Sequence, residues 1–262
     1  MHADSEIKMA RHYIEHMDEV EGWFSKESAA LITAVHLFQR SLSLPGDILE
    51  IGVWRGKSGI LLCQLIDPDD EQCVLSDRFD GGDFPYVYGE DYLAALEDNL
   101  SRWVEYSDSV VIEECDSTHL PPRVVHMSGS IRICHVDGSH QYERAMEDML
   151  ICADLLMPRG CMIVDDAFNI CLLGVNQALN EFLRTSPFTA FAVGFDKVFL
   201  CHEDCYDEYF GMWTSQEIVS FMDDYDIGQN QFLKRPAFFY GREVATLVNR
   251  TILPDATPGQ SS

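Results

Sequence analysis

Short β-rich apolar runs alternate with helical patterns through the middle of the chain, and this alternation constrains the fold more than any other feature. Apolar runs without polar alternation are typical of strands that are buried on both faces, and helices connect such strands when they are parallel. The pattern predicts strands at 47–52, 72–77, 109–114, 130–137, 160–165, 188–194 and 197–202. It predicts helices at 5–18, 26–42, 56–66, 89–103, 141–156 and 172–184.

We therefore predict an α/β fold with a Rossmann-like, mostly parallel sheet of about seven strands and helices on both faces. Only Gly194-Phe195-Asp196 separates the last two strands, so strand seven is expected to be antiparallel. We expect one structural domain with three parts, namely an N-terminal helical cap (1–45), the core (46–205) and a C-terminal extension (206–262). In the extension, a helix is predicted at 214–225 and a strand at 237–248.

Each of the first five predicted strands ends in, or is directly followed by, a carboxylate. Open α/β sheets bind ligands beyond the carboxyl ends of their strands. Acids that were merely solvated would not be expected at five consecutive strand ends, so the pattern predicts one shared site. The carboxylates are Glu50, Asp77, Asp116, Asp137 and the pair Asp165–Asp166.

The first strand leads into the glycine loop Leu-Glu-Ile-Gly-Val-Trp-Arg-Gly-Lys-Ser-Gly, which spans 49–59. Gly52 and Gly56 are spaced G-x-x-x-G, which is neither the dinucleotide fingerprint nor the phosphate loop of nucleoside triphosphatases. A dehydrogenase and a triphosphatase are therefore disfavoured. By itself the loop is equally consistent with a ligand site and with a turn that packs a helix on a strand.

The chain is strongly acidic, with 44 acidic and 18 basic residues and a formal charge of −26. Such a surface repels nucleic acid and anionic membranes, so neither is expected as a partner. The charged N-terminus and the lack of a membrane-length apolar run predict a cytoplasmic protein. The nine cysteines fall mostly in apolar segments and are expected to be reduced, and Cys201-His202-x-x-Cys205 is better explained by a strand end than by a metal site.

Several motifs in the same order resemble class I S-adenosylmethionine-dependent methyltransferases. They are E-x-G-x-x-x-G-x-S from Glu50 to Ser58, the acid at Asp77, and Asp116-Ser117. Three further pieces sharpen the resemblance to the small-molecule O-methyltransferases related to macrocin and mycinamicin sugar methyltransferases. These pieces are Glu21-Gly22-Trp23, VDGSHQYERAMEDM after strand four, and LLMPRGCMIVDDA through strand five, so the resemblance covers roughly 20–202.

The resemblance implies S-adenosylmethionine as the cofactor, with S-adenosylhomocysteine as its product. Gly52 and Gly56 are expected to flank the methionine part, Ser58 belongs to the same motif, and Glu50 is expected near the amino group.

The resemblance also assigns the nucleoside part. Asp77 is expected to accept the ribose hydroxyls, since a carboxylate accepts several hydrogen bonds. Asp116 and Ser117 are expected at the adenine edge, and Trp23 is expected either to cover the bound cofactor or to pack in the core.

Asp137, Asp165 and Asp166 are expected at the ends of adjacent strands, where three unpaired acids would raise one another's pKa. A divalent cation would relieve this repulsion, and oxygen ligands favour Mg²⁺. In the resembled sugar methyltransferases the corresponding acids hold a metal that also binds two neighbouring substrate hydroxyls. His140 is expected either as the general base, with Asp137 beside it, or as the anchor of a loop. Ser139 departs from relatives that carry a second acid at its position.

The predicted function is metal-assisted O-methylation of a hydroxyl on a polar small molecule, such as a sugar or a natural product. Open alternatives are a metal-independent or N-directed methyltransferase, and a cephalosporin hydroxylase-like relative that keeps the fold with different chemistry. Relatives of this kind often self-associate, so a homo-oligomer also stays open. The segment 79–90 is read either as a lid or as a packed crossover, and Glu143, Arg144, Glu147 and Asp148 as an exposed helix face.

Overall fold

The computed structural model describes residues 2–82, 91–105, 107–120, 124–229 and 236–249. Its centre is one mixed sheet in the order β3-β2-β1-β4-β5-β7-β6-β10-β8, with β9 paired to β10. The first seven strands are β1 (Asp47–Ile51), β2 (Cys73–Asp77), β3 (Val110–Glu114), β4 (Ile131–Val136), β5 (Leu156–Val164), β6 (Phe188–Gly194) and β7 (Lys197–His202). Strands β1 to β5 pair in parallel, and β7 is antiparallel to both β5 and β6, as predicted.

The C-terminal extension differs from the prediction because it continues the sheet. Its strands are β8 (Ile227–Gln229), β9 (Ala237–Phe239) and β10 (Arg242–Asn249), and they bring the sheet to ten strands. Strand β10 lies parallel to β6, with Ala245 opposite Ala192. The extension therefore covers what would otherwise be an unpaired edge at β6.

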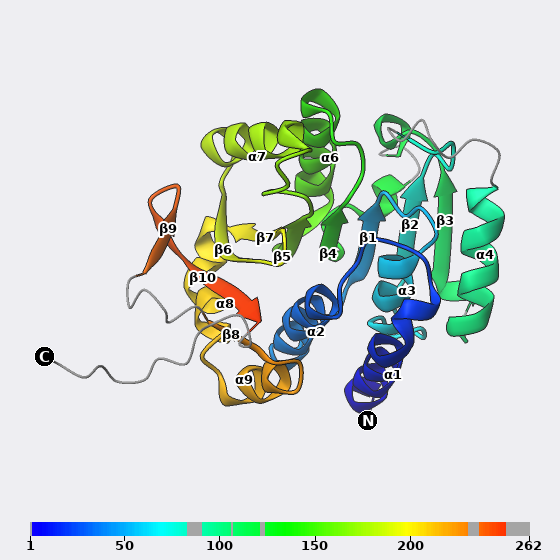
Figure 1. The fold of residues 1–262 in the computed structure, drawn as a ribbon, viewed down its shortest axis with the longest axis horizontal. Coiled ribbons are helices and arrows are strands. Elements are labelled where there is room, and N and C mark those ends of the chain that lie inside the picture. The colour runs from blue at the N-terminus through cyan, green and yellow to red at the C-terminus, as the bar shows by residue number, and fades with distance from the viewer. Residues whose placement is uncertain (1, 83–90, 106, 121–123, 230–235, 250–262) are drawn as a thin grey trace, which may run out of the picture.

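Helices cover both faces of the sheet, as predicted (Figure 1). One face carries α1 (His2–His16), α2 (Lys26–Ser41), α3 (Lys57–Gln64), α4 (Tyr92–Trp103), α8 (Tyr206–Met212) and α9 (Gln216–Asp223). The other face carries α6 (Tyr142–Leu155) and α7 (Leu173–Thr185). Successive strand residues alternate between the two cores, so that Ile133 belongs to the core on the α2 face and Cys134 to the core on the α6 face.

Arg132 crosslinks the end of the fold opposite the carboxyl ends of the strands. Its side chain is fully buried, and it donates to Gly46 O at 2.9 Å, Leu65 O at 2.6 Å and Gln39 Oε1 at 3.0 Å. Glu71 lies 3.6 Å away as its counter-ion. Burial lowers the pKa of Arg132 to about 10, but the group stays charged at neutral pH.

None of the nine cysteines, all of which lie in the described ranges, forms a disulfide, and seven of them are buried. Among the same residues, no helix is both long enough and apolar enough to cross a bilayer.

Candidate active site

A cavity of about 820 Å³ opens where the carboxyl ends of the parallel strands meet. Its walls come from the loops that follow β1, β2, β3, β4 and β5, together with the segment between α1 and α2. Residues 83–90, which hold most of the predicted lid, lie outside the described residues. Among the predicted site residues, the following line the cavity: Trp23, Gly52, Ser58, Asp77, Asp116, Ser117, Asp137, His140, Asp165 and Asp166.

Gly52 brings the ends of β1 and β4 into direct contact. Its φ is +88°, and a Cβ at this position would lie only 1.9 Å from the carbonyl oxygen of Asp137. Any other residue would push the two strand ends apart, so the glycine is required by the shape of the cavity floor.

Gly56 has a different role from the one expected. With φ at +84° it is the N-cap of α3, and a Cβ would lie 2.4 Å from Leu96 Cδ1. It packs α3 against α4 and does not line the cavity. Ser58, in the first turn of the same helix, is 6% exposed and does line it.

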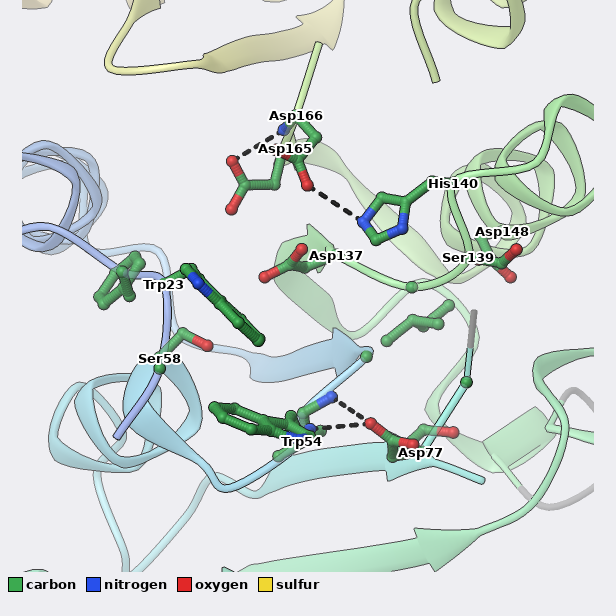
Figure 2. A pocket seen from close by; sticks show the side chains of 18 of the residues that line it. Trp23, Trp54, Ser58, Asp77, Asp137, Ser139, His140, Asp148, Asp165 and Asp166 are labelled. Carbon is green, nitrogen blue, oxygen red and sulfur yellow. Dashed lines mark hydrogen bonds and ion pairs between the residues drawn. The ribbon is translucent and has the colours of Figure 1, made fainter. Parts of the chain in front are cut away.

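The Asp77 carboxylate holds the glycine loop in place. Its Oδ2 accepts hydrogen bonds from Val53 N at 2.7 Å and Trp54 N at 2.8 Å, while its Oδ1 accepts one from Phe79 N at 2.8 Å. Figure 2 shows the first two of these bonds at the lower end of the cavity. Since a carboxylate has about four acceptor positions, three are used here and one is left for a ligand.

Trp23 is part of the rim of the cavity and not part of the core, which excludes the core-packing alternative. It is 75% exposed, and its indole stacks on that of Trp54 with 4.7 Å between the ring centroids. Both rings face the cavity (Figure 2). The ion pair between Glu21 and Arg55, with 2.5 Å between Oε2 and Nη1, joins the two loops that carry these tryptophans.

Asp116 and Ser117 follow β3 and reach the cavity from its far side. The Thr118 hydroxyl donates to Asp116 Oδ1 at 2.7 Å and lowers the pKa of this acid, which Arg144 also approaches at 3.4 Å. Ser117 forms a side-chain hydrogen bond with Asp148.

Asp148 corrects the prediction that this part of α6 is an exposed face. It is 2% exposed and lines the cavity, and its Oδ2 lies 2.7 Å from the position of a Cβ built on Gly138. Burial raises the pKa of Asp148 to about 6. The helical spacing from Ala145 to Asp148, Cys152 and Leu155 is the sequence signal that places Asp148 on the buried stripe.

Glu50 was expected beside the amino group of the cofactor, but it lies beneath the cavity and does not line its wall. It is fully buried, and its Oε1 is 2.8 Å from His135 Nδ1. These two residues are direct partners in the β1–β4 pairing. His135 could not be identified from the sequence, since nothing in the chain adjacent to it indicates a carboxylate partner.

His140 and Asp166 form a close pair at the upper end of the cavity (Figure 2), with His140 Nε2 3.1 Å from Asp166 Oδ2. Burial alone would raise the pKa of Asp166, but hydrogen bonds from His140 and Asn169 outweigh it and lower the pKa. The pKa of Asp137 shifts the other way and is well above its usual range because of burial and the nearby charge of Asp165. Two acids with opposite pKa shifts in one pocket are typical of acid–base chemistry.

The three acids predicted to hold Mg²⁺ do not gather into one set of ligands. Among the described residues that surround these acids, two overlapping groups have donor atoms within 4.8 Å of one another, and neither contains all three acids. One group is His135, Asp137 and Asp165, and the other is Asp137, His140 and Asp166.

The reason for this separation is Lys197. Its ammonium forms a buried ion pair with Asp165 Oδ2, and the two side chains are 2% and 9% exposed. A doubly charged ion on Asp165 would lie about 4 Å from this ammonium and be repelled by about 8 kcal/mol at an effective dielectric constant of about 20. The all-carboxylate set predicted for Mg²⁺ therefore does not fit the arrangement of these side chains.

Comparison with known proteins relates this chain to methyltransferases. Residues 49–167 match the family model described as "Methyltransferase domain". A search of curated proteins finds no match.

Solved methyltransferase structures share the fold at low sequence identity. The O-methyltransferase NovP is 17% identical, with a TM-score of 0.54 over 69% of this chain and 83% of NovP. CalS11, a TDP-rhamnose 3'-O-methyltransferase of calicheamicin biosynthesis, is 20% identical, with a TM-score of 0.51 over 65% of this chain and 78% of its own. TomG from Streptomyces achromogenes, an O-methyltransferase of tomaymycin synthesis solved with S-adenosylmethionine, is 18% identical, with a TM-score of 0.51 over 75% of this chain and 87% of its own.

These matches confirm the resemblance that the sequence motifs indicated. The chain shares the fold of these methyltransferase structures, and residues 49–167 match the model of a methyltransferase domain.

Proposed function

We propose that this protein transfers a methyl group from S-adenosylmethionine to a hydroxyl of a polar small molecule, such as a sugar or a natural product. The observation that carries the proposal is that the cofactor motifs and an acid–histidine pair face each other in one cavity of about 820 Å³. A volume near the upper end of the range for ligand sites leaves room for a cofactor and a small acceptor together. NovP and CalS11, which share the fold and are both O-methyltransferases, support the same class of reaction.

The two ends of the cavity suit the two reactants. Asp77 keeps one acceptor position for the ribose, and Ser117 and Asp116 lie on the side expected for adenine. Gly52 leaves the cavity floor open to the methionine part, and the Trp23–Trp54 stack forms an apolar rim beside it. The acceptor is left with the end that holds Asp137, His140 and Asp166.

Methyl transfer is an in-line displacement, so the protein mainly has to align the acceptor and remove its proton. The cofactor supplies an electrophilic methyl group when it is bound. His140, as a neutral imidazole, can accept the hydroxyl proton, and Asp166 at 3.1 Å stabilises the imidazolium that results. Asp137, on the same wall, is within reach of the acceptor hydroxyl as a hydrogen-bond partner.

A direct test combines calorimetry with an activity assay on the full chain. We expect S-adenosylhomocysteine to bind with a Kd of roughly micromolar order. We also expect a panel of glycosides and hydroxylated natural products to include an acceptor that gains 14 mass units at oxygen, the mass of one CH₂. Absence of both heat and thermal shift with S-adenosylmethionine and S-adenosylhomocysteine would overturn the proposal.

The same assay separates the hydroxyl from an amine as acceptor. Fragmentation of the methylated product locates the new methyl group on oxygen or on nitrogen. A product methylated at nitrogen would retain the cofactor part of the proposal and overturn the assignment of the acceptor.

A further inference from the structure

Lys197 puts a fixed positive charge among the acids at the reacting end of the cavity. It lines the cavity and is nonetheless 2% exposed, with its ammonium on Asp165 and 5.2 Å from the centre of the Phe24 ring. The same charge favours the ionised forms of Asp137 and Asp166, although burial and Asp165 still leave the pKa of Asp137 raised. One lysine thus acts on all three carboxylates that were predicted to hold a divalent cation.

The sheet itself positions this lysine. Strands β5 and β7 are antiparallel, and Val164 pairs with Val198 at the end of their ladder. One further step along this register sets Asp165 opposite Lys197, and such opposite residues have Cβ atoms about 4.5–5.5 Å apart. The ion pair is therefore built into the strand pairing and does not depend on a flexible loop.

A buried ammonium keeps its charge only where anions compensate it. Around Lys197 the compensation comes from Asp165 in direct contact, with Asp166 nearby and the π face of Phe24. His135 also faces this group, with Nε2 3.9 Å from Asp165 Oδ2. Asp165 is therefore held in the ion pair with Lys197.

We propose that Lys197 is a positioning residue that takes the place of a divalent cation, so that this site works without a bound metal. The reaction it serves rests on the proposed function, whereas its effect on metal binding does not. Removing the ammonium should free Asp165 and turn the acids into a cation site. The lysine therefore determines whether this pocket binds a divalent cation.

The test measures binding of Mn²⁺ alone, by the loss of its free-ion electron paramagnetic resonance signal, on EDTA-treated full-length protein. Wild type is expected to bind Mn²⁺ with a Kd of about 1 mM or weaker, as exposed acids do. Lys197→Met is expected to bind at least about tenfold more tightly, because a third carboxylate becomes available. The double variant Lys197→Met with Asp165→Asn should return to the wild-type value.

Two controls separate this effect from a general change in charge. Lys57→Met removes the other cavity lysine that the structure describes, whose Nζ lies 3.3 Å from Gly22 O, and should leave Mn²⁺ binding unchanged. Lys197→Arg keeps the cation and should also match wild type. If Lys197→Met does not fold, the proposal is tested with wild type and with the double variant Lys197→Met, Asp165→Asn. Both must then bind Mn²⁺ weakly.

The proposal is overturned if wild type binds Mn²⁺ with a Kd below about 0.1 mM, or if Lys197→Met gains no affinity while remaining folded. Methyl transfer that is lost with EDTA and restored with Mg²⁺ would also overturn it. Failure to bind S-adenosylhomocysteine would instead contradict the proposed function and leave the Mn²⁺ comparison intact.

Discussion

Asp77 is the residue whose replacement tests both the architecture of the site and its use. Its carboxylate accepts three backbone hydrogen bonds, two from the glycine loop and one from Phe79 N. In Asp77→Asn the amide keeps one acceptor oxygen, so the two glycine-loop bonds can persist in a weaker, uncharged form. The amide nitrogen then faces Phe79 N, and that bond is lost.

The magnitude follows from these contacts. A hydrogen bond to a charged group contributes about 1.5–3 kcal/mol, so the loss of one and the weakening of two should cost about 2–3 kcal/mol in the free energy of unfolding. At about 2–4 °C per kcal/mol for a chain of this size, Tm should fall by about 5–10 °C. Affinity for S-adenosylhomocysteine should fall at least about tenfold, or about 1.4 kcal/mol, since a ribose acceptor is altered and the loop loosens.

Scanning calorimetry measures the first effect and titration calorimetry the second. The matched control is Asp47→Asn, because Asp47 also accepts a backbone bond, from Gln72 N at 2.8 Å, but lies at the opposite end of β1. The control should lose stability and keep its affinity for S-adenosylhomocysteine. An Asp77→Asn variant with Tm within about 2 °C of wild type and an unchanged Kd would refute the reasoning. A loss of stability equal to that of Asp47→Asn, without loss of affinity, would mean that Asp77 has only a structural role.

Three further predictions follow from the same geometry. His140→Ala should lower kcat by about a hundredfold or more, as for a lost general base, while Kd for S-adenosylhomocysteine changes less than about twofold; equal losses in both would mean that His140 only anchors its loop. Burial raises the pKa of Asp148 from 3.8 to about 6, so between these pH values the folded chain keeps a proton that the unfolded chain has lost. The contribution of Asp148 to stability is therefore present below pH 4 and lost as pH rises through 6. Denaturant titrations should show wild type losing about 3 kcal/mol relative to Asp148→Asn across this window, and a constant difference between the two would contradict the assignment. Arg132→Met should cost about 3–5 kcal/mol, because it leaves Glu71 as a buried, less compensated charge, with no change in cofactor affinity of the folded protein; a loss of affinity comparable to that of Asp77→Asn would show that the two ends of the sheet are coupled.

Much of the architecture could be predicted because it depends on local patterns. The seven strands of the core and the helices between them lie within a few residues of their predicted positions, since apolar periodicity reports burial directly. The largest shift is in β5, which begins at Leu156 and not at 160, because Leu156 already pairs with Ile131 beyond a register shift in β4. Strand β10 could be predicted as a strand, but its parallel pairing with β6 joins segments about 50 residues apart and has no local signature.

The convergence of the acids can be predicted from the sequence alone, because parallel strands that each end in a carboxylate bring those carboxylates to one edge of the sheet. Which carboxylates remain available there was decided only by tertiary structure. The antiparallel register of β7 sets Lys197 on Asp165, the parallel register of β1 and β4 sets His135 on Glu50, and the helical phase of α6 turns Asp148 into the cavity. Partners of this kind come from distant segments, so a pattern along the chain can predict where charges gather but not how they are paired.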